Sequence, residues 1–371
     1  MSQKTVIGVV GCGGFCRGNH IPNLLANPRV RLKSLCDLNP DGLEQYGTEV
    51  ITTDMEELFA DPEIQGVVCA TKPDARFEAM ELAKKFRKPL FVEKPLCWGE
   101  EQTFKAVEMM RDFKDLIFVG FNREFSPMMQ DAYKYFKERC TAGNTTIIYR
   151  IIGESVLWPH HHWTAVVDRK ESTIVHEVTH IFQLMRFFTG SYPLSVNTSG
   201  GGNMDNIITL EYPDNITVVI IAGDNSSSAF PKEYLEIIGN HTVIAGYNFS
   251  ELEVTSSDGT FIRKRYPYTV AGKKYVMGRQ ETDVQRREFR KSITKEEMAY
   301  GYYYDRQIKV DKGHPQEMEF FRRCAAGKTP SPINLFDGAA ANIIAYRAVQ
   351  SHTEKRRVEI DIPKELGIKN C

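Results

Sequence analysis

The chain has 371 residues, and its formal net charge at pH 7 is −1. This near balance of charges excludes the basic surface with which nucleic-acid-binding proteins neutralise phosphates. No apolar run reaches the roughly 18 residues of a membrane-spanning helix, so we expect no membrane span, and the length favours two domains.

Residues 4–120 alternate short apolar runs with helical stretches. This alternation predicts an α/β fold with a parallel, doubly wound sheet, which is the Rossmann architecture of a dinucleotide-binding domain. We place that domain at residues 1–122. Its expected strands are 5–10, 30–36, 66–70, 89–92 and 116–120, and its expected helices are 18–27, 40–46, 54–60, 74–86 and 99–113.

The pattern changes after residue 123, where strands separated by turn residues predominate. We predict a second domain over 123–371, an α+β domain with a mostly antiparallel open sheet. Residues 268–310 are polar and weakly periodic, and we interpret them as a long loop or an interface arm. The expected strands are 144–151, 206–212, 216–223, 233–238 and 243–247, and the expected helices are 126–138, 174–188, 314–326 and 336–350.

The cysteines and the start of the chain bear on the compartment. Eight cysteines are present and none forms a Cys-x-x-Cys pair. That usage is typical of thiols in a reducing compartment and gives neither a disulfide framework nor a thiolate zinc site. Residues 1–4 lead directly into an apolar run, without the pattern of a secretory signal peptide. We therefore expect a cytoplasmic protein.

A glycine loop follows the first expected strand, with the sequence Gly11-Cys12-Gly13-Gly14-Phe15-Cys16. In dinucleotide-binding folds the first glycine allows a tight turn and the second lets the backbone approach a pyrophosphate. Cys16 takes the place of the third glycine, where a small residue allows close packing of helix on strand. The strand before the loop and the helix after it favour a dinucleotide site.

Asp37 ends the second expected strand. A carboxylate at this position accepts hydrogen bonds from the adenosine ribose and repels a 2′-phosphate. Leu38 and Asn39 follow, with no arginine to bind that phosphate. The sequence therefore favours NAD over NADP, the alternative being that Asp37 is only a turn residue before Asn39-Pro40.

Lys94 follows an apolar run from Pro89 to Val92 and precedes Pro95. It therefore stands at the carboxyl end of a strand, where open α/β sheets bind ligands. A lysine that is partly desolvated there can act as an acid or base near neutral pH. The alternative is a surface lysine that simply follows a strand.

The segment His176-Glu177-Val178-Thr179-His180 matches the His-Glu-x-x-His spacing of zinc hydrolases. On a helix this spacing places two histidines on one face, with the glutamate as general base. A dinucleotide fold is not needed by such an enzyme, and no third ligand stands at a recognised spacing. We therefore expect no metal and keep a zinc hydrolase as an alternative function.

Six segments carry a family resemblance: VVGCGGFCRGNHIPNL, VVCATKPDARFEAMELAKKFRKPLFVEKPL, FVGFNREFSP, HHWTAVVDRKESTIVHEVTHIFQLMRFFTG, DKGHPQEMEFF and GKTPSPINLFDGAAANIIAYRAVQS. They resemble the Gfo/Idh/MocA oxidoreductases, the family of glucose-fructose oxidoreductase and inositol dehydrogenase, over nearly the whole chain. In that resemblance Lys94 matches the catalytic lysine. Glu177 and His180 match a Glu-x-x-His pair of that family. His176 stands where glycine is usual, so the zinc-like spacing would be an accident of that one residue.

The resemblance implies a dehydrogenase that transfers hydride between NAD and a ring hydroxyl, or ketone, of a sugar, glycoside or cyclitol. Lys94 and His180 would share the hydroxyl proton, without a choice between them. Residues Glu177, Arg123, His162 and Trp163 would bind the substrate. The residues expected to bind the cofactor are Gly11, Gly13, Gly14, Phe15, Cys16, Asp37, Thr71, Pro73, Glu93, Lys94 and Asn122.

Some positions depart from the family pattern around the expected sugar site, namely Lys72, Arg76, Glu124, Lys170, Glu171, Ser172 and Gln183. They leave the substrate open. A non-catalytic NAD-binding regulator on the same fold is a further alternative, although it would need neither Lys94 nor His180. By analogy with open antiparallel sheets that pair subunits, we expect a homodimer or homotetramer.

Overall fold

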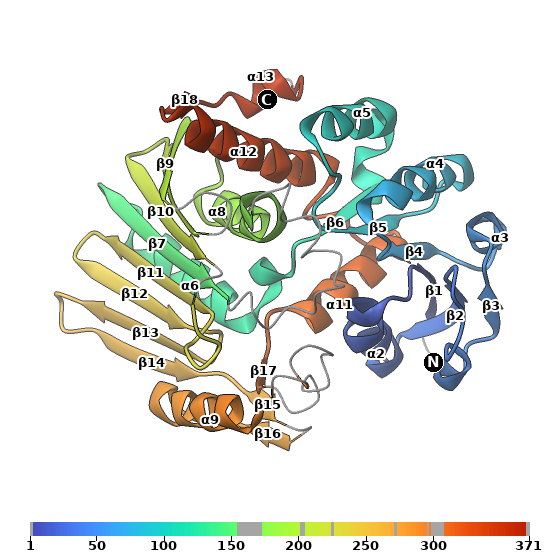
Figure 1. Cartoon of the computed structure of the whole chain (residues 1–371), viewed down its shortest axis with the longest axis horizontal. Helices are drawn as coiled ribbons and strands as arrows, with labels where there is room; N and C mark the ends of the chain where they lie inside the picture. The colour runs from blue at the N-terminus through green and yellow to red at the C-terminus, as the bar shows by residue number, and fades with distance from the viewer. Residues whose placement is uncertain are drawn as a thin grey trace. The chain divides into compact units, whose positions relative to one another are not determined.

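The computed structural model describes residues 3–153, 173–200, 205–223, 226–270, 273–294, 297 and 308–368. The chain divides into two compact units (Figure 1). Unit 1 comprises Met1–Asn122, Gly313–Ile343 and Leu366–Cys371, and unit 2 comprises Arg123–Lys312 and Ile344–Glu365. The first division between the units follows residue 122, and residues 313–343 belong to unit 1. The boundaries expected for the two domains, 1–122 and 123–371, stay a prediction.

Unit 1 contains a parallel sheet with the strand order β3-β2-β1-β4-β5-β6. Its strands are β1 (Thr5–Val10), β2 (Val30–Cys36), β3 (Val50–Thr52), β4 (Gly66–Cys69), β5 (Leu90–Glu93) and β6 (Ile117–Gly120). Strands β4, β5 and β6 are buried along their whole length, as expected for a sheet covered on both faces. The prediction of a Rossmann-type α/β domain is confirmed.

The strand order of unit 1 reverses between β1 and β4, which are neighbours in the sheet but not in sequence. Loops that leave adjacent strands in opposite directions open a crevice at this point, where doubly wound folds bind ligands. The helical segments of the first 122 residues are α1 (Gly14–Gly18), α2 (His20–Ala26), η1 (Glu44–Tyr46), α3 (Met55–Ala60), η2 (Pro73–Ala75), α4 (Arg76–Phe86), α5 (Glu100–Met110) and η3 (Arg111–Leu116).

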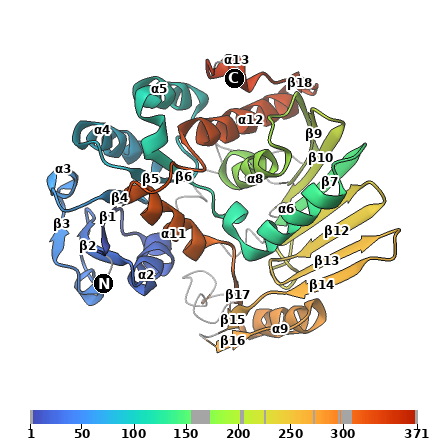
Figure 2. The same ribbon diagram turned by 180° about the vertical axis from the view of Figure 1, so that it is seen from behind.

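Helix α11 (His314–Ala325) packs on α2 and β1 of unit 1 (Figures 1 and 2). Nη1 of Arg322 donates to Oγ1 of Thr5 at 3.3 Å, and Nδ2 of Asn27 donates to Oε2 of Glu319 at 2.8 Å. These contacts span almost the whole sequence. They explain why the segment after residue 312 belongs with the dinucleotide fold.

Unit 2 contains a sheet with the strand order β14-β13-β12-β11-β7-β10-β9-β8-β18. All neighbouring pairs are antiparallel except β7 and β10. The expected α+β domain with a mostly antiparallel sheet is confirmed. Its strands are β7 (Thr145–Ile152), β8 (Ser195–Gly200), β9 (Asp205–Tyr212), β10 (Ile216–Gly223), β11 (Glu233–Gly239), β12 (Thr242–Tyr247), β13 (Glu251–Ser256), β14 (Phe261–Arg265) and β18 (Val358–Glu359).

One face of this sheet is buried and the other is open. Alternate residues of β7 are buried, as the period of two requires when one face packs on helices. Helix α6 (Pro127–Arg139) packs on β12 and β13 (Figure 2). The remaining helical segments after residue 121 are η4 (Asn122–Phe125), the π-helical turn Ile174–Val178, α8 (Thr179–Thr189), α9 (Arg279–Ser292), α12 (Leu335–Glu354) and α13 (Ile362–Glu365). No helix within the described ranges is long and apolar enough to cross a membrane.

The interpretation of residues 268–310 as a long loop is wrong, whereas that of an interface arm stays a prediction. This segment contains β15 (Tyr268–Val270), β16 (Lys273–Tyr275), α9 and β17 (Ile308–Val310), and the three strands form a small antiparallel sheet. Thr282 is the buried residue of α9, and the other residues of this helix are half-buried or exposed. Because most of them are polar, the sequence carries no apolar periodicity. The sequence analysis also missed β3, β8, β13, β14 and β18, which are short strands or lie toward the edges of their sheets.

Gly66 is required by the packing of α11 on the sheet. A Cβ atom at residue 66 would lie 2.6 Å from Cβ of Ala325 and 3.2 Å from Cζ of Phe321. We predict that Gly66→Ala lowers the free energy of unfolding by about 1–3 kcal/mol, because the helix must move outward. Urea unfolding followed by circular dichroism measures this change. Gly18→Ala is the control, because a Cβ atom at residue 18 meets nothing within 4 Å, and an equal loss in both variants would contradict the prediction.

Candidate functional site

The loop after β1 is shaped by Gly11. Its φ is +83°, and a Cβ atom there would lie 2.6 Å from the backbone nitrogen of Thr71. Only glycine meets both conditions, so the loop passes close to the end of β4. A Cβ atom at Gly13 or Gly14 would meet nothing within 4 Å. The backbone of these two residues is thus open to the close approach of a pyrophosphate.

Cys16 occupies the position of the third glycine and is only 1% exposed. Its hydrogen bond with Cys12 and its burial both raise the pKa of its thiol well above the ordinary value. The sulfur of Cys12 also lies 3.7 Å from the carbonyl oxygen of Cys36 at the end of β2. Both cysteines are therefore packing residues beneath the loop.

Asp37 joins the end of β2 to the glycine loop. Its Oδ2 accepts from the backbone N–H of Cys12 at 2.6 Å, and its Oδ1 accepts from that of Asn39 at 2.9 Å. The sequence analysis missed Arg17 of α1, which donates to the carbonyl oxygens of Cys12 and Asp41 at 2.7 and 3.0 Å. An arginine therefore lies beside the turn that follows Asp37, although the residues directly after Asp37 in sequence, Leu38 and Asn39, include no arginine.

Arg76 connects the loops that follow β4 and β5. It is 2% exposed and donates to the carbonyl oxygen of Thr71 at 3.2 Å from Nε and 3.0 Å from Nη2. Its Nη1 donates to the carbonyl oxygen of Pro95. Burial lowers the pKa of the guanidinium below its ordinary value. The departure from the family pattern at this position thus has a structural role, in which Arg76 fixes the spacing of two loops.

Glu93 is the buried carboxylate beside Lys94. Its Oε2 accepts from the backbone N–H of Lys94 at 3.0 Å, and its Oε1 lies 2.6 Å from Nε2 of His20. Burial alone would raise the pKa of this carboxyl, but the hydrogen bond from His20 and the charges of His20, Lys94 and Arg76 lower it below the ordinary value. Glu93 is therefore ionised, and His20 donates to it.

The residues expected to bind the cofactor lie at the carboxyl ends of the parallel strands of unit 1. Phe15, in the first turn of α1, is 49% exposed. Pro73 begins η2 after β4, and Asn122 begins η4 after β6. The open glycine backbone, the carboxylate at the end of β2 and the conformation of Gly11 fit a dinucleotide. The residues so placed are Gly11, Gly13, Gly14, Phe15, Cys16, Asp37, Thr71, Pro73, Glu93, Lys94 and Asn122.

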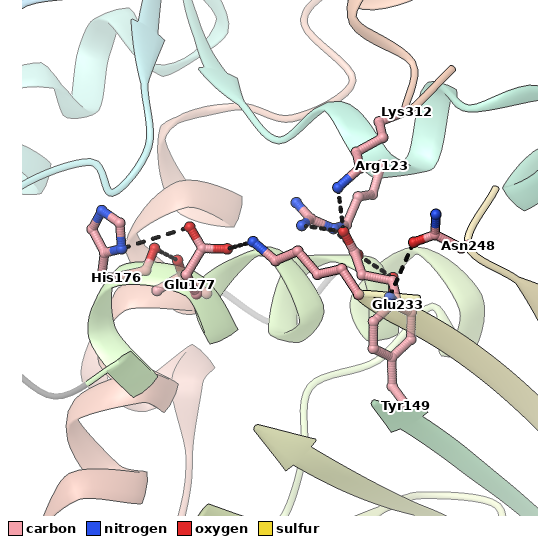
Figure 3. A network of polar contacts seen from close by, with 9 residues as sticks. Arg123, Tyr149, His176, Glu177, Glu233, Asn248 and Lys312 are labelled. Atoms are coloured by element: carbon pink, nitrogen blue, oxygen red, sulfur yellow. Dashed lines mark hydrogen bonds and ion pairs between the residues drawn. The ribbon is translucent and has the colours of Figure 1, made fainter. Parts of the chain in front are cut away.

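Unit 2 contains a buried charge network centred on Glu233, the first residue of β11 (Figure 3). Arg123 donates to it at 2.7 Å from Nε and at 3.0 Å from Nη2, and the hydroxyl of Tyr149 donates at 2.6 Å. Nζ of Lys312 lies 2.6 Å from Oε1. Burial alone would raise the pKa of Glu233, but the charges of Arg123 and Lys312 bring it well below the ordinary value.

The cations of this network respond to their surroundings in different ways. Burial, together with the charges of Lys232 and Arg123, lowers the pKa of Lys312 to about 8 despite the opposing charge of Glu233. Burial also lowers the pKa of Lys232, but Glu177 and Glu233 outweigh it and raise that pKa above the ordinary value. Nζ of Lys232 donates to Oε2 of Glu177 at 3.1 Å. Arg123 and Glu177, both expected to bind substrate, thus lie in one polar network.

His176 and His180 do not lie on one regular α-helix. Residues 174–178 form a π-helical turn and α8 begins at Thr179, so the spacing expected of an α-helical zinc motif does not apply. Nδ1 of His176 lies 3.6 Å from Oε1 of Glu177, and His180 is 6% exposed. In the described part of the chain, no three His, Cys, Asp or Glu side chains are grouped so that they could hold a metal ion.

Two further departures from the family pattern are paired with each other. Nε2 of Gln183 on α8 donates to Oε2 of Glu124 at 2.5 Å. His162 and Trp163, which we expect to line the substrate pocket, lie outside the described residues. Of the two expected catalytic residues, Lys94 belongs to unit 1 and His180 to unit 2.

Residues 5–121 match the model of an oxidoreductase family with an NAD-binding Rossmann fold. The chain is 23% identical over 361 residues to myo-inositol 2-dehydrogenase of Thermotoga maritima, covering 96% of this chain and 98% of that protein. It is 25% identical over 272 residues to inositol 2-dehydrogenase of Rhizobium meliloti, covering 68% and 79%.

The fold of the whole chain also has solved counterparts. Scyllo-inositol dehydrogenase of Lactobacillus casei, solved with NAD(H) and scyllo-inositol, superposes with a TM-score of 0.70 and 16% identity, covering 96% of this chain and 99% of that one. The match of residues 5–121, the similarity of the relatives and the shared fold agree: residues 5–121 form the NAD-binding domain of a Gfo/Idh/MocA oxidoreductase, and the chain as a whole resembles that family.

Proposed function

We propose that the protein is an NAD-dependent dehydrogenase that transfers hydride between nicotinamide and a ring hydroxyl, or ketone, of a cyclitol, sugar or glycoside. The observation that carries this proposal is the position of Lys94. Its backbone is fixed by the ionised Glu93 at the carboxyl end of β5, in the same sheet edge as the open glycine loop. The relatives named for action on inositols support the substrate class.

Oxidation of an alcohol requires a group that accepts the hydroxyl proton while hydride leaves the carbon. Bound NAD supplies the hydride acceptor. We assign Lys94 to the reacting hydroxyl of the substrate, which its ammonium would orient and whose proton it would share. We assign His180 as the second proton-handling group, because an imidazole titrates near neutral pH. Glu177 would bind a substrate hydroxyl, and its contact with Lys232 holds its carboxylate in place.

Arg123 contributes indirectly to this function. Because two of its N–H groups are directed at Glu233, we assign it to shaping the polar wall of unit 2 rather than to a substrate contact. His162 and Trp163 remain our candidates for the pocket wall, where an aromatic face would suit the C–H surface of a ring. The cysteines, six of them buried in the described ranges, support a cytoplasmic location.

We predict that Lys94→Ala lowers kcat for NADH formation by about a hundredfold to ten-thousandfold, because proton transfer then lacks its positioned partner. The dissociation constant for NAD changes little, since Asp37 and the glycine loop remain. Initial rates with a panel of inositols and pyranoses, and fluorescence titration with NADH, measure the two quantities.

Lys85→Ala is the control for this experiment, because Lys85 is exposed on α4 and pairs with Glu56. If no member of the panel reduces NAD while NAD still binds, the catalytic assignment is contradicted and a non-catalytic NAD-binding protein is favoured. If activity depends on stoichiometric zinc that a chelator removes, the alternative zinc hydrolase is favoured.

We predict that the enzyme prefers NAD to NADP and that Asp37→Asn shifts the ratio of their kcat/KM values toward NADP by about tenfold or more, because one negative charge beside the 2′-position is removed. The substituted asparagine retains an oxygen that accepts from the N–H of Cys12, and Arg17 remains beside the turn. Asp112→Asn, at an exposed site on η3, serves as the control. An unchanged ratio would refute this role for Asp37.

We propose that copies of the chain pair through the open face of the sheet of unit 2. Ile207 and Ile221 face each other across β9 and β10, as do Ile238 and Val243 across β11 and β12, and all four are at least 36% exposed. Such an apolar stripe is typical of a subunit interface. Static light scattering should show a dimer or tetramer that Ile207→Glu with Ile221→Glu dissociates, whereas Leu25→Glu on α2 does not. An oligomer that persists in the Ile207→Glu, Ile221→Glu variant would exclude this face as the subunit interface.

A further inference from the structure

His20 is a buried titratable residue that has no role in the reaction as proposed above. It is the first residue of α2, its exposure is 0%, and its Nε2 lies 2.6 Å from Oε1 of Glu93. Its ring also contacts those of Phe15 and Phe91, with both pairs of centroids 5.2 Å apart. One side chain thus contacts the glycine loop, strand β5 and the carboxylate that holds Lys94.

The end of β6 leaves room for this arrangement. Gly120 pairs with Glu93 across β5 and β6. A Cβ atom at residue 120 would lie 2.7 Å from Cζ of Phe91 and 3.3 Å from Oε1 of Glu93. Any larger residue would displace the ring that packs on His20 or the carboxylate itself. The absence of a side chain at residue 120 therefore leaves Phe91 and Glu93 in the positions from which they contact His20.

A buried carboxylate is stable only when donors replace the water that it has lost. Glu93 has two such donors, the ring of His20 on Oε1 and the backbone N–H of Lys94 on Oε2. Without the hydrogen bond from His20, the carboxylate of Glu93 would gain a proton more readily. The carboxyl O–H group would then be a donor, and it could stand where the backbone N–H of Lys94 needs an acceptor. The backbone of Lys94 depends on Glu93, and Glu93 depends on His20.

We propose that His20 is a positioning residue for Lys94 and acts through the carboxylate of Glu93. This inference rests on the proposed dehydrogenase function, in which Lys94 orients the reacting hydroxyl. His20 would contact neither the cofactor nor the substrate. It would keep Glu93 ionised over the working pH range, so that the main chain of Lys94 retains its acceptor.

The other titratable groups that face Glu93 are Lys94 on the same strand end, Arg76 on α4, Cys16 on α1 and Cys69 on β4. The cations favour the ionised carboxylate, as His20 does, and burial opposes it. When His20 is removed, one of the groups that oppose the effect of burial is lost, and the pKa of Glu93 rises. Activity that needs the carboxylate is then lost at a higher pH during acidification.

The test measures the pH dependence of kcat/KM for NADH formation in His20→Met and in the double variant His20→Met with Glu93→Gln. In His20→Met we expect the pKa of Glu93 to rise by about one to two units, which corresponds to the loss of one hydrogen bond to a charged group. The acid limb of the profile should move upward with that pKa. In the double variant we expect no such movement, because glutamine does not titrate. The same upward shift in both variants, or in neither, would overturn the inference.

Two matched variants separate positioning from general damage. His20→Gln keeps an N–H donor near the position of Nε2, and we expect an acid limb close to that of the parent. His241→Asn replaces an exposed histidine in the β11–β12 turn, where φ is +56°, and should leave the profile unchanged. If His20→Gln shifts the limb as far as His20→Met does, the donor role is refuted.

A second readout needs no turnover. In the parent protein the lowered pKa of Glu93 stabilises the fold at pH values above the unfolded pKa, and this contribution is lost as the pH falls through the folded pKa. In His20→Met the folded pKa of Glu93 is raised, so the ionised carboxylate destabilises the fold at neutral pH. This destabilisation disappears on acidification, when the carboxylate gains a proton. The difference in Tm between His20→Met and the parent should therefore narrow as the pH falls toward the unfolded pKa of glutamate, about 4.3. The double variant should show no narrowing above that pH, because its glutamine does not titrate.

The two readouts distinguish the inference from the function on which it rests. If the parent reduces no NAD with any cyclitol or sugar but the difference in Tm narrows, the proposed function fails and the link from His20 to Glu93 stands. If the parent is active and neither the acid limb nor the difference in Tm responds to His20→Met, the function stands and His20 is only a packing residue.

Discussion

Buried carboxylates fix the positions of the functional side chains in both units. Glu93 lies at the end of β5 and Glu233 at the start of β11, and neither is more than 8% exposed. A carboxylate without water must be matched by donors, and removing one partner of such a pair typically costs about 3–5 kcal/mol. The donors are thereby held in place: His20 and the backbone of Lys94 around Glu93, and Arg123, Tyr149 and Lys312 around Glu233.

In unit 1 this constraint connects the sheet to the proposed chemistry. The same edge that buries Glu93 leaves the backbone of Gly13 and Gly14 open and presents Asp37 at the end of β2. Arg76 connects the loops after β4 and β5 through two carbonyl oxygens. A dinucleotide bound there would meet loops whose spacing is set by buried polar contacts. Such preorganisation favours hydride transfer, because little rearrangement is needed when the reactants meet.

Much of this arrangement is predictable from the sequence, and what is not depends on distant contacts. The strands of the parallel sheet are short apolar runs, so their positions, and those of the glycine loop, Asp37 and Lys94 at their ends, follow from local pattern. The return of α11 to unit 1 does not, because Arg322 meets Thr5 at the other end of the chain. His20 and Glu93 are 73 residues apart in sequence, and no local pattern couples them. Gly66, the first residue of β4, and Gly120, the last residue of β6, are the signals that would have revealed such close packing.

We propose that hydride passes between a ring carbon and nicotinamide beside Lys94. The most direct test offers the enzyme NAD with inositols and pyranoses deuterated at their ring carbons and follows the label by mass spectrometry. We predict that deuterium appears at C4 of the reduced nicotinamide and that the label stays on the sugar or cyclitol when Lys94 is replaced by alanine. Reduced nicotinamide without label, or full transfer by the alanine variant, would contradict it.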